Sequence, residues 1–281
     1  MEQPVIIEAA INGLTSKQEN PNVPRSASEI TADALACLEA GATIVHNHVD
    51  VVMVDGPAAA ACYLESWEPV WQKVPGALLY PTVNAGSVEM SFSHLPMLAA
   101  AGCRIGIIDA GSVNLGDFVY VNSSSDIEHQ LRICVENQLA PSMAIFEPGF
   151  LRKALQLFQQ HLLPTGTMLK LYFAAESGYL GGVFGLPPTE PALDAYLSIL
   201  GDCPLPWSVA VMGDDVVDSA VGRLAVERGG HIHVGLEDWA GVGAPTNADV
   251  VSRATTLCAE VGRPVSDHVQ TAELLCLPAR G

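Results

Sequence analysis

The chain has 281 residues, of which 49% are apolar and 16% charged, and its 31 acidic residues outnumber its 13 basic ones. This apolar fraction is normal for a folded protein with a large core and excludes an intrinsically disordered chain. A net charge of −18 argues against binding to nucleic acid or to anionic membrane surfaces. An anionic substrate stays compatible with it, because a metal ion or a few local cations can reverse the field within one pocket.

Mean hydropathy is +0.29, yet the apolar runs, such as residues 95–101 and 207–212, are far shorter than the roughly 18 residues of a membrane span. The N-terminus lacks the basic segment of a signal peptide. The seven cysteines are widely spaced and form no Cys-x-x-Cys pair, which is typical of reduced thiols rather than of disulfides or a zinc ribbon. We therefore expect a cytoplasmic protein without membrane segments.

Strand-like and helix-like segments alternate along the chain. Residues 5–10 open with β-branched side chains and predict a strand, and Ser26-Ala27-Ser28-Glu29 forms a capping box before a helix that extends to residue 40. Further strands are predicted at residues 43–48, 77–82, 104–109, 142–146, 168–173, 208–211 and 231–236. The helices that follow them are predicted at residues 58–73, 95–101, 125–137, 150–161, 191–200, 217–228 and 247–261.

Eight strands that alternate with helices favour parallel pairing. This number of repeats in 281 residues fits an α/β fold of the (β/α)8 TIM-barrel type, with residues 1–281 as a single domain. A doubly wound sheet is the alternative, but no G-x-G-x-x-G fingerprint follows an early strand. The glycine-rich residues 178–185, after the sixth strand, predict a mobile segment that covers the substrate.

Two histidines end the second predicted strand, at the end of a TIM barrel where catalytic groups lie. His46 and His48 are two residues apart, so a strand presents both on one face and both could bind one ion. Two polar side chains that bind only the backbone would explain the same pattern. The residues alone leave both readings open.

The eighth predicted strand carries His231 and His233 and ends near Glu237 and Asp238. These histidines share a face with Glu237, whose carboxylate could complete a site of two histidines and one carboxylate with positions open for substrate. A simple acidic turn is the alternative for Glu237 and Asp238. No Gly-x-Ser-x-Gly elbow is present, so a serine nucleophile has little support.

Several segments together resemble the β-keto acid cleavage enzymes, and the resemblance runs nearly end to end. The segments are Ala-Ala-Ile-Asn-Gly (9–13), Glu-Ala-Gly-Ala-Thr-Ile-Val-His-Asn-His-Val (39–49), Pro-Thr-Val-Asn (81–84), Gly-Ser-Val-Asn (111–114), Gly-Gly-His-Ile-His-Val-Gly-Leu-Glu-Asp (229–238) and Asn-Ala-Asp-Val-Val (247–251). The resemblance implies a TIM barrel that assembles as a homo-oligomer, commonly a tetramer. It also implies an enzyme that condenses a β-keto acid with acetyl-CoA and cleaves the adduct to acetoacetate and a new CoA thioester.

The resemblance further implies the roles of individual residues. His46, His48 and Glu237 would hold a zinc ion or another divalent metal, which suits the stabilisation of an alkoxide. Asp238 would act as general base, with position 233 as its partner. Thr82 and Ser112 would lie near the substrate, and the ends of the third and fourth strands add Asn84 and Asn114 as further candidates for substrate binding.

Five positions depart from the family pattern. His233 and Asp50 stand where the family has arginines, and a histidine near pH 7 carries no permanent charge. Leu14 replaces an acid that binds the substrate's ammonium group, and Ser142 and Ala144 replace other acids. We therefore expect a β-keto acid without an amino group there, and a pocket in which the metal is the principal cation.

Two other functions remain open from the sequence. The same site could serve a metal-dependent aldolase or hydrolase that does not use CoA. A non-catalytic relative could keep the metal only as structure or to sense a ligand, and His233 and Asp50 are the residues that keep this reading open.

Overall fold

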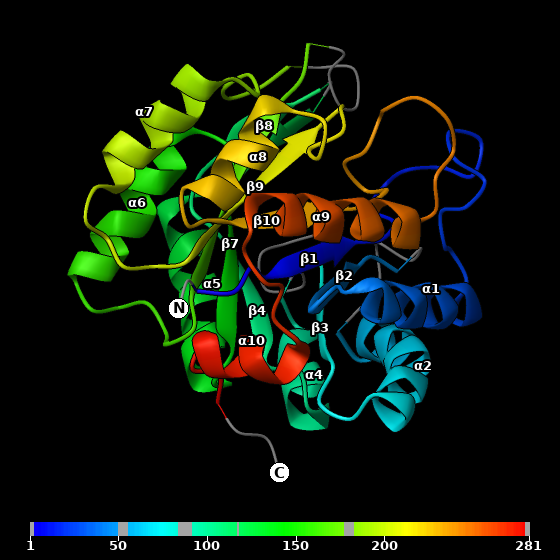
Figure 1. Cartoon of the computed structure of the whole chain (residues 1–281). Helices are drawn as coiled ribbons and strands as arrows, with labels where there is room; N and C mark the ends of the chain where they lie inside the picture. The colour runs from blue at the N-terminus through cyan, green and yellow to red at the C-terminus, as the bar shows by residue number, and fades with distance from the viewer. Residues whose placement is uncertain (1–2, 50–55, 84–91, 117, 177–182, 279–281) are drawn as a thin grey trace.

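The computed structural model describes residues 3–49, 56–83, 92–116, 118–176 and 183–278. Within these ranges, eight short parallel strands form one sheet, and helices surround it (Figure 1). The predicted (β/α)8 barrel is confirmed. The glycine-rich loop predicted at 178–185 lies largely outside the described residues.

The barrel strands lie within two residues of their predicted boundaries. They are β1 (Ile7–Ala10), β2 (Ile44–Asn47), β3 (Leu78–Pro81), β4 (Ile105–Asp109), β7 (Ala140–Ile145), β8 (Met168–Ala174), β9 (Trp207–Met212) and β10 (His231–Val234). Their order in the sheet is β3-β2-β1-β10-β9-β8-β7-β4. The two outer strands, β3 and β4, contact each other and bring the barrel close to closure.

The surrounding helices are α1 (Ala27–Ala40), α2 (Gly56–Lys73), α4 (Leu95–Ala101), α5 (Ser124–Glu136), α6 (Pro148–Gln159), α7 (Glu190–Leu200), α8 (Ala220–Glu227) and α9 (Asn247–Val261). The predicted capping box is formed, since Ser26 and Glu29 each bind the other's backbone N–H. Among the described residues, no helix is long and apolar enough to cross a membrane.

Two features were not predicted. A hairpin of β5 (Val113–Leu115) and β6 (Phe118–Tyr120) follows β4, and its strands are too short to show a period of two. A short helix, α10 (His268–Leu274), lies below the barrel in Figure 1. Its place at the N-terminal ends of the strands follows from the hydrogen bond that Ser266 N donates to Val5 O.

The interior of the barrel is polar at its centre. Glu8 on β1, Tyr80 on β3 and Lys170 on β8 contact one another although their strands are not neighbours in the sheet. Such contacts can form only across the barrel, so these side chains point inward. Since Glu8 is 1% exposed and Lys170 5%, the barrel holds a buried ion pair rather than a purely apolar filling.

A turn after β10 places the two acidic residues that follow it. Gly235 has φ +139°, and a Cβ there would lie 2.0 Å from the carbonyl oxygen of Ala10. Glu237 N donates a hydrogen bond of 3.1 Å to the same oxygen. Only glycine allows this close approach of the two backbones, and the approach holds Glu237 over the end of β1.

Gly235→Ala is therefore expected to lower the free energy of unfolding by about 3 kcal/mol, the sum of an unfavourable φ and a backbone clash. Gly229→Ala is the matched control, because Gly229 has φ +88° with open space around its Cα, and about 1 kcal/mol is expected. Urea unfolding of both variants measures the difference. Equal losses would show that the contact with Ala10 is unimportant.

Candidate metal and catalytic site

Three predicted residues meet at the C-terminal end of the barrel. His46 lies in β2, His48 follows it, and Glu237 comes from the turn after β10. Glu237 Oε2 lies 3.4 Å from His46 Nε2, and Glu237 Oε1 lies 3.1 Å from His48 Nε2. One ligand atom from each residue lies within 4.8 Å of the others, so the three could surround one ion.

The chemistry of this cluster fits a divalent cation. Burial lowers the pKa of His46 to about 3, so the ring is neutral, and its Nδ1 lies 3.3 Å from Tyr80 O. A proton on Nδ1 donated to that oxygen leaves the Nε2 lone pair free for a metal. Burial alone would raise the pKa of Glu237, but the neighbouring histidines hold it below its ordinary value. Its Oε2 accepts no hydrogen bond from any described residue, and an ion would satisfy it.

Asp238 lies beside this cluster and faces His233. The distance between Asp238 Oδ2 and His233 Nε2 is 3.0 Å, and Glu8 Oε1 lies 2.7 Å from the other ring nitrogen, Nδ1. Carboxylate oxygens thus lie within 3.0 Å of both ring nitrogens, an arrangement that favours a proton on each nitrogen and a positively charged ring. Burial and Lys170 disfavour this charge, but Glu8 and Asp238 outweigh them and raise the pKa of His233 to about 9. The side chain at position 233 is thus positively charged near neutral pH, whereas we expected an uncharged histidine there.

Sequence reasoning missed Glu8, Tyr80 and Lys170. Glu8 Oε1 accepts hydrogen bonds from Lys170 Nζ, at 3.0 Å, and from the Tyr80 hydroxyl, and Lys170 Nζ also lies 2.7 Å from that hydroxyl oxygen. A single charged residue inside each of two apolar strands was the available signal, because unpaired charges are almost never fully buried. Lys170 is a buried cation that the sequence analysis did not anticipate, and it is already paired with Glu8.

The residues expected to bind substrate occupy different settings. Thr82 is half-buried directly after β3, and its backbone is fixed by hydrogen bonds with Tyr63 and His94. Ser112 is exposed and its hydroxyl donates to Asn122 O and accepts from Asn122 N. Their roles stay predictions. Exposed Asn114 lies on the β5–β6 hairpin, while Asn84 and Asp50 lie outside the described residues.

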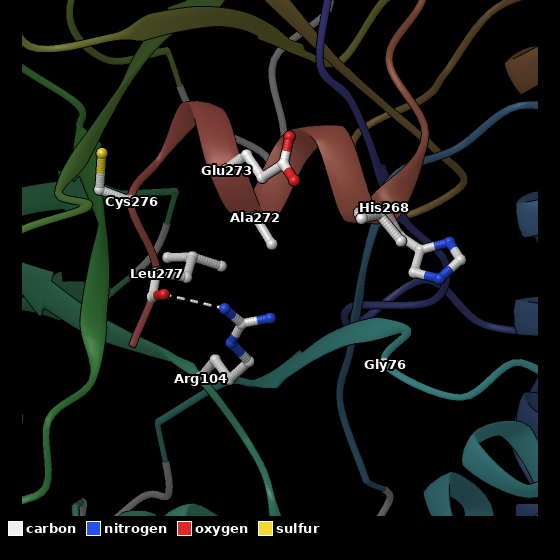
Figure 2. Close-up of a pocket in the computed structure, with 8 residues that line it drawn as sticks. Gly76, Arg104, His268, Ala272, Glu273, Cys276 and Leu277 are labelled. Atoms are coloured by element: carbon white, nitrogen blue, oxygen red, sulfur yellow. Dashed lines mark hydrogen bonds between the residues drawn. The ribbon is translucent and has the colours of Figure 1, made fainter. Parts of the chain in front are cut away.

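A separate hollow of about 380 Å³ lies at the opposite end of the barrel, beneath α10 (Figure 2). The Arg104 guanidinium, which lines it, donates hydrogen bonds to the backbone carbonyls of Leu277 and Pro278. These bonds tie the C-terminal segment to the start of β4. The hollow contains none of the residues of the histidine–glutamate cluster.

The fold and the grouping of two histidines, a glutamate and a paired aspartate at the catalytic end of the strands define a TIM-barrel enzyme. A family model for the beta-keto acid cleavage enzymes matches residues 4–277. The chain belongs to this family.

Two relatives in sequence align with the chain over nearly their whole length, and a solved structure shares its fold. The chain is 25% identical to the 3-keto-5-aminohexanoate cleavage enzyme of Acetoanaerobium sticklandii, with 98% of each chain covered. It is 28% identical to the 3-oxoadipate:acetyl-CoA acetyltransferase of Cupriavidus necator, with 99% of this chain and 97% of the relative covered. Among solved structures, apo ObcA has the same fold, with a TM-score of 0.70 at 16% identity over 92% of this chain and 66% of ObcA.

Proposed function

We propose that this enzyme transfers the acyl group of a β-keto acid to CoA, with acetyl-CoA as the second substrate and acetoacetate as the other product. The observation that carries the proposal is the His46, His48 and Glu237 cluster directly beside the buried pair of Asp238 and His233. The Cupriavidus necator relative is a 3-oxoadipate:acetyl-CoA acetyltransferase, which supports acetyl-CoA as the second substrate.

The reaction balances with one proton and two carbon–carbon bond changes. Asp238 removes a proton from the carbon between the keto and carboxylate groups, and that carbon attacks the acetyl carbonyl and expels CoA thiolate. The thiolate attacks the original keto carbon, the bond between that carbon and the former nucleophile breaks, and the proton returns to acetoacetate. The chain must therefore supply a base and stabilise negative charge that develops on the keto oxygen.

The residues present divide these tasks. His46, His48 and Glu237 would hold a divalent metal, zinc by preference, and when bound it would act as a Lewis acid toward the keto oxygen. Asp238, 4% exposed, takes and returns the proton. His233 orients Asp238 through Nε2 and stabilises its charged form.

The expected substrate has a tail without an ammonium group. Leu14 is half exposed, and Ser142 and Ala144 on β7 are buried, so none of these positions offers a carboxylate to a cationic tail. For the assembly we propose a homo-oligomer, a tetramer by resemblance, which light scattering on the purified protein tests.

The test is a panel of β-keto acids with different tails, each incubated with and without acetyl-CoA, on zinc-replete and chelator-treated protein. We expect acetoacetate and a CoA thioester only when acetyl-CoA and metal are both present. Cleavage that ignores acetyl-CoA would support the aldolase or hydrolase alternative. Bound metal without turnover across the panel would support the non-catalytic alternative.

A further inference from the structure

One carboxylate oxygen at the centre of the barrel accepts three hydrogen bonds. Glu8 Oε1 accepts hydrogen bonds from His233 Nδ1, at an N···O distance of 2.7 Å, from Lys170 Nζ, at 3.0 Å, and from the Tyr80 hydroxyl. The donors come from β10, β8 and β3, so the barrel surrounds Glu8 with donors from three sides. This fixes the position of the carboxylate relative to His233.

His231, the other histidine of β10, offers a comparison for the charge of His233, because no carboxylate of the described residues shifts its pKa. His231 lies two residues earlier and is equally buried, 1% exposed. Its Nδ1 accepts a hydrogen bond from Ile6 N at 3.0 Å, and burial together with the positive charge of Arg263 lowers its pKa to about 3. His231 is thus neutral, whereas carboxylates face both ring nitrogens of His233. Asp238 alone would leave the second nitrogen of His233 without an acceptor.

We propose that Glu8 is a positioning residue, which holds His233 as a doubly protonated ring that presents Nε2–H to Asp238. The inference rests on the proposed function of Asp238 as base. Glu8 is not one of the proposed metal ligands, so this role would explain its presence beside them. Lys170 neutralises the Glu8 carboxylate, and the Tyr80 hydroxyl donates a hydrogen bond to it. Without these partners the carboxylate would be costly to bury.

A contribution to stability alone does not explain why Glu8 and Lys170 are charged. Replacing a buried ion pair by apolar side chains of similar volume is often neutral or stabilising, so stability alone does not call for Glu8 and Lys170 in the barrel. The charged groups that interact with His233 among the described residues are Glu8, Asp238, Lys170 and, on the metal side, Glu237. Of these, Glu8 is the one that hydrogen-bonds both to His233 and to Lys170 and Tyr80 on more distant strands of the barrel.

The test compares Glu8→Gln, which removes the charge but keeps the shape, with Glu8→Asp, which keeps the charge. His231→Asn is the control, because Asn Oδ1 can accept the Ile6 N–H in place of Nδ1. In the wild type at pH 7, ¹⁵N NMR of His233 should show two protonated ring nitrogens, in metal-free and zinc-loaded protein alike. Glu8→Gln should show one and lower kcat by about 10- to 100-fold with a smaller change in KM, and Glu8→Asp should recover part of both.

A singly protonated His233 in the wild type would overturn the proposal, even if Glu8→Gln fails to fold. Two protonated nitrogens in Glu8→Gln, or a loss of kcat no larger than in His231→Asn, would overturn it as well. The NMR result does not depend on turnover. If the wild type has two protonated nitrogens but transfers no acyl group, the proposed function fails while the positioning of His233 by Glu8 stands.

Discussion

Asp238→Asn is expected to lower kcat by about a thousandfold, within the range found for removal of a general base, while the protein keeps about one divalent ion per chain. The amide cannot accept the proton from the substrate, but it fills the same space beside His233. Metal content by elemental analysis and kcat with β-keto acid and acetyl-CoA measure the two effects separately.

Asp218→Asn is the control for this variant. Asp218 is an acid near the same end of the barrel, with a side chain that is 76% exposed and paired with Arg253, so no change in kcat is expected. If Asp238→Asn kept wild-type kcat, another group would be the base. If it lost the metal as well, its effect could not be assigned to proton transfer.

Glu237→Ala is expected to reduce bound metal to a trace, because two neutral histidines without the carboxylate form an incomplete site. Activity should fall by about three orders of magnitude with the loss of the Lewis acid. Added zinc should raise the Tm of the wild type, since an ion that binds only the folded state stabilises it, and should leave the Tm of the variant unchanged.

Glu176→Gln, at an exposed acid after β8, controls for the loss of one negative charge and should bind zinc as the wild type does. A Glu237→Ala protein with full metal content would remove Glu237 from the ligand set. His46 and His48 would then need another partner.

The buried charges explain why a metal suits this acidic protein. The metal cluster and the barrel interior beside it contain three buried carboxylates, Glu8, Glu237 and Asp238, against two cations, Lys170 and His233. A divalent ion would reverse this net negative charge and favour an anionic substrate. The chain's acidity therefore continues into its pocket, although two buried cations moderate it.

The sequence predicted the barrel and the meeting of His46, His48 and Glu237 because both follow from local patterns. Strand and helix periods define the elements, and the closing of the sheet sets β2 and β10 on either side of β1. Polar residues at the ends of such neighbouring strands must then lie close together.

The interior network could not be predicted in this way. Glu8, Tyr80 and Lys170 meet across the barrel, and which residues of opposite strands face each other depends on register and tilt, which local patterns do not show. The charge of His233 was misjudged because it depends on Glu8, its register partner on the neighbouring strand β1, which lies 225 positions away in the chain.

The most direct test of acyl transfer through condensation follows the acetyl carbons of acetyl-CoA. With ¹³C in both acetyl carbons, mass spectrometry and NMR should find the label in the keto and methyl carbons of acetoacetate, and none in the new CoA thioester, whose acyl group comes from the β-keto acid. Label recovered only as acetate, or acetoacetate formed without label, would contradict acyl transfer through condensation with acetyl-CoA.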